Sequence, residues 1–291
     1  MADIRATVAT ALAEAKSVGV DRLDAHRLLA HLLGHPRTWL LAHQDEPVSA
    51  TVIEAWRAAV IRRAAGEPLA YLLGSIEFFG LSLRVTPSVL VPRPDTETLV
   101  NWAIELLQQR AAALPSPRVL DLGTGSGAIA LAIKHACRAA SVVATDTSAQ
   151  ALTVAESNGQ ELGLGVEWRL GDWWHPVDSD RFDLVVSNPP YIAAHDPHLA
   201  ALSHEPALAL TSGADGLSAL RHIVAGSPGQ LNTGGWLLVE HGYNQASAMR
   251  DLFVATGFTD VGTRFDFGGQ PRCTGAKWEP NILATKSARK A

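Results

Sequence analysis

The chain of 291 residues contains only two cysteines, Cys137 and Cys273, which lie far apart in the sequence. Secreted domains that depend on disulfides carry ladders of paired cysteines, and this chain has none. We therefore expect a reducing compartment, with the cytoplasm as the default location. The sequence also lacks an uninterrupted apolar run long enough to span a bilayer, so no membrane partner is expected.

A strong basic charge is missing as well. The formal net charge is −5, and residues 1–85 carry equal numbers of basic and acidic side chains. Neither part of the chain has the basic surface that a nucleic-acid platform needs, which makes nucleic acid an unlikely partner. The early acidic residues Asp3 and Glu14 are not typical of a signal peptide. An apolar content of 47% with 18% charged residues indicates a globular protein, and the length favours two domains.

The first part of the chain has the periodicity of helices. Apolar residues recur at helical spacing, and Asp21 and Ser49 each precede such a run as N-cap residues. We predict a small helical bundle domain over residues 1–74. Because no cysteine or acid completes a ligand set at a known spacing, its histidines do not indicate a metal site. These histidines are His26, His31, His35 and His43.

The pattern changes after this helical part. Residues 75–94 alternate in polarity around Gly80 and predict a β-hairpin connector. From residue 95 to residue 291, short apolar runs alternate with helical segments, which favours an α/β fold with a mostly parallel sheet and helices on both faces. The apolar runs are "RVLDLG", "SVVATD", "VEWRL", "FDLVVSN" and "GWLLVEHG".

A glycine loop follows the first of these runs, in "VLDLGTGSGAIALA". Glycines permit a tight turn and close approach of a ligand to the backbone. Asp146 ends the next run, about 20 residues later, where an acid commonly binds ribose hydroxyls. The predicted cofactor-binding loop consists of Gly123, Thr124, Gly125, Ser126 and Gly127.

The spacing within this loop is informative about the cofactor. Gly-x-Gly-x-Gly differs from the Gly-x-Gly-x-x-Gly of dinucleotide sites. Asp121 precedes the loop, and its carboxylate suits a cationic amino group better than a pyrophosphate. Together these features favour a nucleoside that carries an amino acid, as S-adenosylmethionine does.

Asp172 and Trp173 follow the third apolar run. Asp172 can accept a hydrogen bond from an adenine amino group, and Trp173 can cover the ring face. A core tryptophan beside a turn aspartate is the competing interpretation. The place of both residues after a strand of a parallel sheet favours contact with a ligand.

The tetrapeptide Asn188, Pro189, Pro190 and Tyr191 follows the fourth run. Two prolines fix the backbone, so the Asn188 amide oxygen and nearby carbonyls can accept both hydrogens of a planar NH2 group. Tyr191 supplies a flat ring for stacking. Holding an NH2 group in this way turns its lone pair toward an electrophile, and orientation then supplies much of the rate. We predict that these four residues are catalytic.

These motifs resemble class I S-adenosylmethionine-dependent methyltransferases that modify planar NH2 nitrogens, and within them the HemK/PrmC family of release factor glutamine methyltransferases. The resemblance covers nearly the whole chain and is most specific in "RRAAGEPLAYLLGSIEFFGLSLRVTPSVLVPRPDTE". The segments "HEPALALTSGADGL" and "GGQPRCTGAKW" are also similar to that family. The resemblance implies a Rossmann-like seven-stranded methyltransferase sheet, with the helical domain joined to it by the hairpin.

The resemblance also implies an activity. The methyl group would pass from S-adenosyl-L-methionine to the side-chain amide nitrogen of glutamine in the Gly-Gly-Gln motif of bacterial class 1 release factors. Residues Gly123 to Gly127 and Asp146 would bind the cofactor, Trp173 would line its site, and Asn188 to Tyr191 would hold the glutamine. The helical domain would help to dock the release factor.

Two segments need interpretations of their own. In "PRPDTE", Pro94 is expected to begin a helix, Asp95 or Thr96 to cap it, and Arg93 to pair with Glu97. We expect this segment to shape the rim of the site, in preference to contacting the ligand directly. The chain's own Gly268-Gly269-Gln270 is interpreted as a coincidence in a C-terminal loop and not as a site of automethylation.

Three alternatives remain at the level of sequence. A methyltransferase acting on adenine or another exocyclic amine in nucleic acid would use the same pocket for a flipped base. A non-catalytic cofactor-binding or partner-binding module is the second. A dinucleotide oxidoreductase is the third, and the glycine spacing disfavours it.

Overall fold

A computed structural model describes residues 6–280 of the chain. The ends of the predicted domain ranges, residues 1–5 and 281–291, lie outside the described residues. The chain divides into two compact units, Met1–Ile76 and Glu77–Ala291, and the boundary falls within the first strand.

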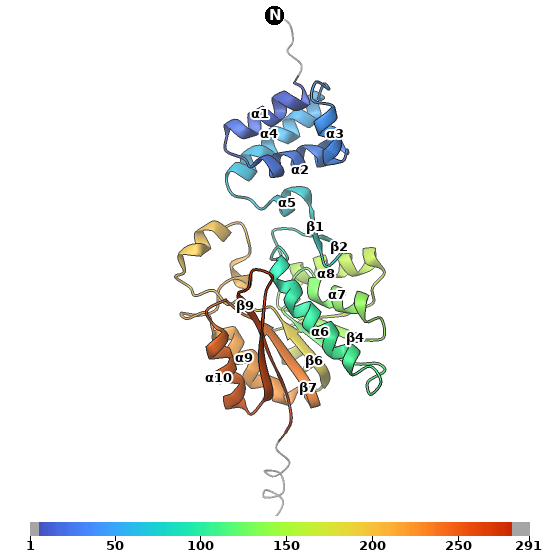
Figure 1. The fold of residues 1–291 in the computed structure, drawn as a ribbon, viewed down its shortest axis with the longest axis vertical. Helices are drawn as coiled ribbons and strands as arrows, with labels where there is room; N and C mark the ends of the chain where they lie inside the picture. The colour runs from blue at the N-terminus through green and yellow to red at the C-terminus, as the bar shows by residue number, and fades with distance from the viewer. Residues whose placement is uncertain (1–5, 281–291) are drawn as a thin grey trace, which may run out of the picture. The chain divides into compact units, whose positions relative to one another are not determined.

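The first unit is helical, as predicted (Figure 1). Asp21 caps α2 by accepting from the backbone N–H of Leu23 at 2.7 Å, and Ser49 caps α4 by accepting from Val52 at 3.4 Å. Its core includes the completely buried Trp56. The helices are α1 (Val8–Ser17), α2 (Arg22–Leu33), α3 (Arg37–Ala42), α4 (Ala50–Ala64) and α5 (Leu69–Leu73).

Two of the histidines in this unit have a packing role. The rings of His35 and His43 each stack on the indole of Trp39, which lies four positions from both in the sequence. The distances between ring centroids are 4.2 Å and 4.1 Å. Within residues 6–280, no group of three or more His, Cys, Asp or Glu side chains is placed to hold a metal ion.

The connector forms a two-stranded hairpin of β1 (Ser75–Phe78) and β2 (Leu81–Arg84). Gly80 at its turn has a φ of 72°, a conformation that favours glycine. The predicted hairpin is therefore present. No helix in the described part of the chain is long and apolar enough to cross a membrane.

The second unit contains a seven-stranded sheet in the order β5-β4-β3-β6-β7-β9-β8. The first five strands of that order are parallel, whereas β9 is antiparallel to β7 and to β8. The predicted α/β fold class is confirmed. The strands are β3 (Arg118–Leu122), β4 (Ser141–Asp146), β5 (Glu167–Leu170), β6 (Phe182–Ser187), β7 (Leu231–Glu240), β8 (Thr259–Phe265) and β9 (Pro271–Lys277).

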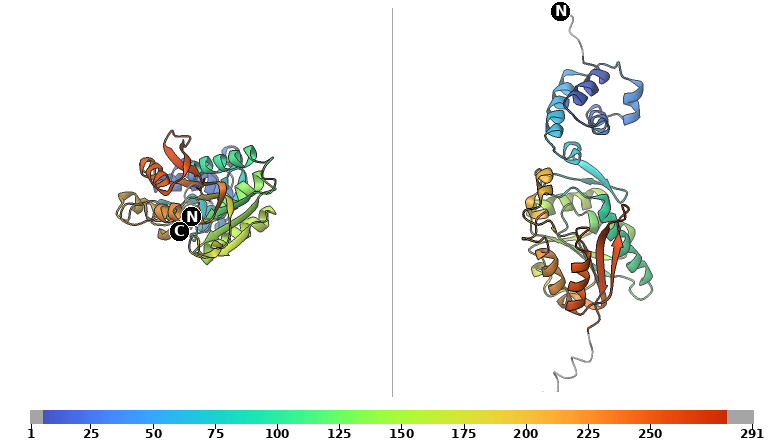
Figure 2. Two further views of the ribbon diagram at one scale, coloured as in Figure 1. Left: turned by 90° about the horizontal axis from the view of Figure 1, so that it is seen from below. Right: turned by 60° about the vertical axis from the view of Figure 1, so that its left-hand side comes forward.

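Helices cover both faces of this sheet (Figures 1 and 2). The α-helices are α6 (Glu97–Gln109), α7 (Ala128–Ala136), α8 (Ala149–Leu162), α9 (Ser218–Gly226) and α10 (Ala246–Thr256). Short 3-10 helices lie between them: η1 (Pro94–Thr96), η2 (His175–Val177), η3 (Pro197–Leu202), η4 (Ala207–Ala209) and η5 (Ser227–Gly229).

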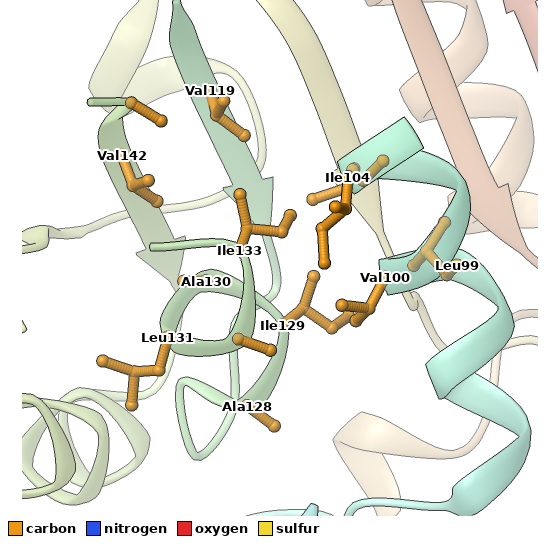
Figure 3. Packing of buried hydrophobic residues seen from close by; sticks show 14 of the residues in the cluster. Leu99, Val100, Ile104, Val119, Ala128, Ile129, Ala130, Leu131, Ile133 and Val142 are labelled. Carbon is orange, nitrogen blue, oxygen red and sulfur yellow. The ribbon is translucent and has the colours of Figure 1, made fainter. Parts of the chain in front are cut away.

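Alternation along the strands explains the two layers. Val119 of β3 packs in the cluster formed with α6 and α7, and its neighbour Leu120 packs in the cluster formed with α9 and α10. Figure 3 shows the first of these clusters, in which Ile129 and Val100 meet between α7 and α6. Apolar residues on successive strand positions are therefore buried on opposite faces, as a strand covered on both sides requires.

The strand order places a topological switch between β3 and β6, because the chain winds outward from this pair in both directions. The two strands are in register, with Leu122 opposite Ser187, and the Ser187 hydroxyl donates to the Leu122 carbonyl at 2.7 Å. The residues that follow, Gly123 and Asn188, therefore leave the sheet side by side. Open α/β sheets bind ligands at such a switch point.

Candidate functional site

A cavity of about 500 Å³ lies at the carboxyl ends of the parallel strands, within the second unit. This volume is in the range of sites for small molecules. Its wall brings together nearly all the predicted site residues from four separate segments. They are Gly123, Thr124, Gly125, Ser126, Asp146, Asp172, Trp173, Asn188, Pro189 and Pro190.

The glycine loop has the backbone conformation that its composition predicted. Gly123, Gly125 and Gly127 have φ values of 73°, 57° and 82°. A Cβ on Gly127 would lie 3.1 Å from both Leu131 and Trp168, tighter than ordinary van der Waals contact. Gly127 is therefore needed for close packing of α7, while the other two shape the turn at the cavity wall.

Asp146 is fixed by backbone donors on both of its oxygens. Oδ2 accepts from the N–H of Gly125 and Oδ1 from the N–H of Ser148, each at 2.9 Å. Burial raises the pKa of this carboxyl above its ordinary value, and the two backbone hydrogen bonds oppose that rise. The result is a preoriented acceptor on the cavity wall, with lone pairs left for hydroxyl donors.

Asp121 has a structural role that the sequence did not predict. Its side chain is completely buried and lies behind the cavity wall instead of on it. Oδ2 accepts from the Thr124 hydroxyl at 2.6 Å and from the N–H of Ala130 at 3.2 Å, so Asp121 braces the glycine loop. Burial raises its pKa to about 7. The Asp121 carboxylate does not line the cavity, so its contact with a ligand amino group stays a prediction.

Asp172 and Trp173 both line the cavity just after β5. Trp173 has a φ of 44°, which is rare for a bulky side chain. Its ring lies 6.1 Å from the ring of His222, another cavity residue. Strained backbone of this kind concentrates at ligand sites, where the surrounding structure holds it in place.

Asn188 lies on the cavity wall with its amide nitrogen already engaged. Its Nδ2 donates to the Thr96 hydroxyl at 3.2 Å, which leaves Oδ1 as the free acceptor. Pro189 and Pro190 continue the wall. Neither proline has a backbone N–H, so they add carbonyl acceptors without a competing donor.

Tyr191, unlike its three neighbours, does not line the cavity. Its hydroxyl donates to Glu240 Oε1 at 3.2 Å, and its carbonyl accepts from Gln245 Nε2 at 3.0 Å. Burial, followed by the charge of Glu240, raises the pKa of the phenol, so Tyr191 stays protonated. Its ring packs against the core cluster beneath the site, and the stacking of this ring on a substrate stays a prediction.

The "PRPDTE" segment forms the rim of the cavity through contacts that the sequence did not indicate. Arg93 forms an ion pair with Glu205 and not with Glu97. Glu97 Oε1 instead accepts from the N–H of Phe79 at 3.0 Å. Pro94 begins η1 as predicted, but neither η1 nor α6 has a side-chain cap. The predicted Arg93–Glu97 pair and the predicted caps are therefore wrong.

Glu205 was not predicted as a site residue. Its side chain is 2% exposed, and Oε2 accepts from the N–H of Val91 at 3.0 Å. It thus fixes the segment that carries Arg93, which lines the cavity. The quoted "HEPALAL" stretch contained this residue, but no local pattern connects it with a segment more than a hundred positions earlier.

The chain's own Gly-Gly-Gln occupies the turn between β8 and β9. Asp266 closes this turn, because its Oδ1 accepts from the N–H of Gln270 at 2.9 Å. Gly269 has a φ of 77°, and Gln270 is exposed. The glycines therefore have a structural reason in the hairpin, which agrees with the interpretation that the motif is a coincidence.

Comparison with known proteins decides the family. Residues 3–74 match the PrmC N-terminal domain, and residues 98–213 match the methyltransferase small domain. The chain is 52% identical over 260 residues to the release factor glutamine methyltransferase of Bordetella pertussis, covering 88% of this chain and 95% of the relative. This chain belongs to the release factor glutamine methyltransferase family.

Other members of the family align over a similar length. The relative from Xylella fastidiosa strain 9a5c is 47% identical, covering 91% of this chain and 96% of the relative. The relative from Vibrio cholerae is 40% identical, covering 93% and 95%. Family membership therefore includes both units, and the prediction that the chain is a methyltransferase is confirmed.

Solved structures support the fold alone. A methyltransferase from Pyrococcus furiosus superposes with a TM-score of 0.51 at 18% identity, covering 77% of this chain and 98% of that one. The catalytic domain of hMettl16, solved in complex with an RNA hairpin, gives a TM-score of 0.54 at 14% identity, covering 82% and 84%. The sheet of the second unit is thus a methyltransferase sheet, and identities this low say nothing about the substrate.

Proposed function

We propose that this protein transfers a methyl group from S-adenosyl-L-methionine to the side-chain amide nitrogen of the glutamine in the Gly-Gly-Gln motif of bacterial class 1 release factors. One observation carries the proposal: Asn188 Nδ2 is bonded to Thr96, so Oδ1 is the acceptor that Asn188 offers on the same cavity wall as the glycine loop. The names of the relatives point to the same substrate. A cytoplasmic location follows from that substrate.

The residues present fit this cofactor. Asp146 is a fixed carboxylate acceptor suited to a pair of ribose hydroxyls, and Asp172 with Trp173 offers an acceptor and a ring face for adenine. Gly123 and Gly125 leave backbone at the wall instead of side chains. When bound, S-adenosylmethionine supplies a methyl group that is already activated by a positively charged sulfur.

The glutamine would be held through its NH2 group. Asn188 Oδ1 accepts one of its hydrogens, and a backbone carbonyl of the following prolines accepts the other. An amide nitrogen is a weak nucleophile because its lone pair is conjugated with the carbonyl. Two acceptors fix the hydrogens, favour the lone pair turning out of conjugation, and strengthen as positive charge develops on nitrogen. No strong base is needed to remove a proton first.

The first unit would contribute to docking of the release factor. It matches the PrmC N-terminal domain as a separate compact unit, and none of the predicted catalytic residues lies in it. The cavity in the second unit is of small-molecule size. Recognition of a whole protein therefore needs a further surface, and the helical unit is the part of the chain that remains for it.

Tandem mass spectrometry of methylated substrate tests this function. The protein would be incubated with methyl-labelled cofactor and a release factor, and in parallel with the release factor carrying alanine in place of the motif glutamine. Label on the glutamine side chain that disappears in the alanine variant is the expected result. Label on DNA or ribosomal RNA, with none on the release factor, would overturn the proposal and favour the nucleic-acid alternative.

The same experiment, run with the protein alone, tests the chain's own Gly-Gly-Gln. We expect no label on Gln270. Label at that residue would show that the β8–β9 turn is a substrate and would contradict its interpretation as a structural turn.

A further inference from the structure

The orientation of Asn188 is set by Thr96, which lies beside it on the cavity wall. Its Nδ2 donates to the Thr96 hydroxyl oxygen at 3.2 Å, and Thr96 is only 4% exposed. An amide has one oxygen acceptor and one nitrogen donor, so committing the nitrogen to Thr96 directs the oxygen to the other side. Without this contact, the amide could rotate and present a donor to the substrate, which would repel an NH2 group.

Thr96 needs a fixed direction of its own to act in this way. A hydroxyl has one hydrogen and two lone pairs, and it accepts reliably only when its hydrogen is occupied elsewhere. The Thr96 hydroxyl opposes the rise in the pKa of the nearby Glu240 carboxyl. An ionised carboxylate attracts a hydroxyl hydrogen, so its charge favours a Thr96 hydrogen that points away from Asn188 and leaves a lone pair for the Asn188 amide.

Glu240 is in turn fixed by its surroundings. It is 1% exposed at the carboxyl end of β7, and its Oε1 accepts from the Tyr191 hydroxyl at 3.2 Å. Arg272 lies close enough to lower the pKa of Glu240 by its charge, while it pairs with Asp266 at 3.0 Å and with Asp95 at 3.4 Å. The chain of contacts thus joins η1, β6, β7 and β9 behind the site.

Burial of the Glu240 carboxylate in its charged form is unfavourable for the stability of the folded state. Burial raises the pKa of Glu240 to about 7, and its second oxygen, Oε2, has no hydrogen bond of good geometry within residues 6–280. A buried charge of this kind is weak evidence for stability, because an apolar side chain of similar volume is often equally stable or more stable. The Tyr191 hydroxyl is the hydrogen-bond donor that the structure gives this carboxylate.

We propose that Thr96 is a positioning residue for methyl transfer: Thr96 accepts from Asn188 Nδ2, and Asn188 Oδ1 is thereby directed toward the substrate NH2 group. This inference rests on the proposed function, because it assigns the orientation of the residue that holds the glutamine. Thr96 does not contribute the acceptor itself.

Thr96→Val is the direct test, because valine keeps the shape of threonine and removes the hydroxyl. We expect kcat for the release factor to fall by about 10- to 100-fold, the size of effect that misorientation of a reacting group causes. Cofactor affinity, measured by calorimetry without turnover, should stay within about twofold of wild type, because the contact does not bear on the glycine loop. Thr96→Ser restores a hydroxyl and should recover most of the activity.

Two controls separate positioning from a loss of structure. Thr98→Val removes a buried hydroxyl two positions away in α6, outside the cavity wall, and should behave as wild type. In a double variant with Asn188→Ala, Thr96→Val should cause no further loss, because both changes remove the same oriented oxygen.

Three results would overturn the inference. They are wild-type kcat in Thr96→Val, a parallel loss of activity and cofactor affinity in that variant, or fully additive losses in the double variant. Failure of the proposed function is a separate outcome, since it is seen when the wild-type protein places no label on the release factor.

Discussion

The two halves of the site are held in different ways. On the side proposed to bind the cofactor, Asp121 holds Thr124 three positions away, and Asp146 holds Gly125 from the next strand, 21 positions away. On the side proposed to bind the substrate, Asn188 contacts Thr96 across 92 positions, and Glu205 contacts Arg93 across 112. The first half is a local motif, whereas the second is assembled from segments that meet only in the fold.

This difference has a functional consequence. The proposed cofactor-binding residues are held by neighbouring strands, so changes elsewhere in the chain should affect them little. The proposed substrate-binding residues depend on several elements that are remote in sequence. Changes on the two sides should therefore separate: those at the glycine loop and Asp146 should alter cofactor affinity, and those around Asn188 should alter turnover.

The largest expected effect comes from Asn188→Ala. Removing the acceptor oxygen should lower kcat for the release factor by about 100- to 1,000-fold, as loss of one preorganised transition-state contact does. Cofactor affinity, measured by calorimetry, should be largely unchanged because Asp146 and the glycine loop remain. A variant that methylates at the wild-type rate would show that Asn188 does not hold the substrate.

Asp146→Ala should give the converse result. Loss of a fixed carboxylate acceptor should weaken cofactor binding by about 10- to 100-fold, since hydrogen bonds to charged groups contribute about 1.5–3 kcal/mol. At saturating cofactor, kcat should recover toward wild type. Asp178→Ala, which removes an exposed carboxylate outside the cavity wall, is a matched control that should leave the dissociation constant unchanged.

The pH dependence of turnover should identify Glu240. The negative charge of its ionised form favours a Thr96 hydrogen that points away from Asn188, so kcat should rise as pH increases through its pKa of about 7, by about tenfold between pH 6 and pH 8 for a single ionisation. Glu240→Gln should have lower kcat and lack this rise. An unchanged pH profile in that variant would assign the ionisation to another group, such as Asp121.

The same ionisation has the opposite effect on stability. Burial raises the folded pKa of Glu240 from 4.5 to about 7, so the folded state binds the proton more tightly than the unfolded state. Its contribution to the free energy of unfolding is present below pH 4.5 and is lost as pH rises through about 7. Denaturant titrations of wild type and Glu240→Gln across this window should show the difference.

Glu205→Gln should have the smallest effect. Glutamine keeps the volume and still accepts from the N–H of Val91, but it loses the ion pair with Arg93. We expect kcat/KM to fall by about two- to tenfold, which corresponds to one weakened hydrogen-bonded contact at the rim. A loss as large as that of Asn188→Ala would mean that Glu205 acts on the chemistry itself.

The same division explains how much the sequence could predict. The strands β3 to β7, the glycine loop and Asp146 follow from local patterns, because apolar runs, glycines and a spaced acid are contiguous in the chain. Thr96, Glu205 and Glu240 could not be found in this way. Each acts through a contact whose partner is remote in sequence, and the short motif around each of them has an ordinary structural explanation.

The edge of the sheet was missed for a related reason. The strand β8 has no fully buried residue, and Thr274 and Gly275 interrupt the apolar pattern of the buried run in β9. Pairing identifies both as strands, because β9 pairs with β7 and β8 pairs with β9. The seven-stranded sheet was expected from family resemblance and not from these segments. The short helices α3 and α5 were also not predicted, because each has too few residues to establish a helical period.

A crystal structure of the protein with demethylated cofactor and glutamine tests the central claim most directly. The account predicts that the glutamine side-chain nitrogen lies within hydrogen-bonding distance of Asn188 Oδ1, with Asn188 Nδ2 still on the Thr96 hydroxyl. A glutamine bound away from Asn188, or an Asn188 amide turned with its nitrogen toward the ligand, would contradict it.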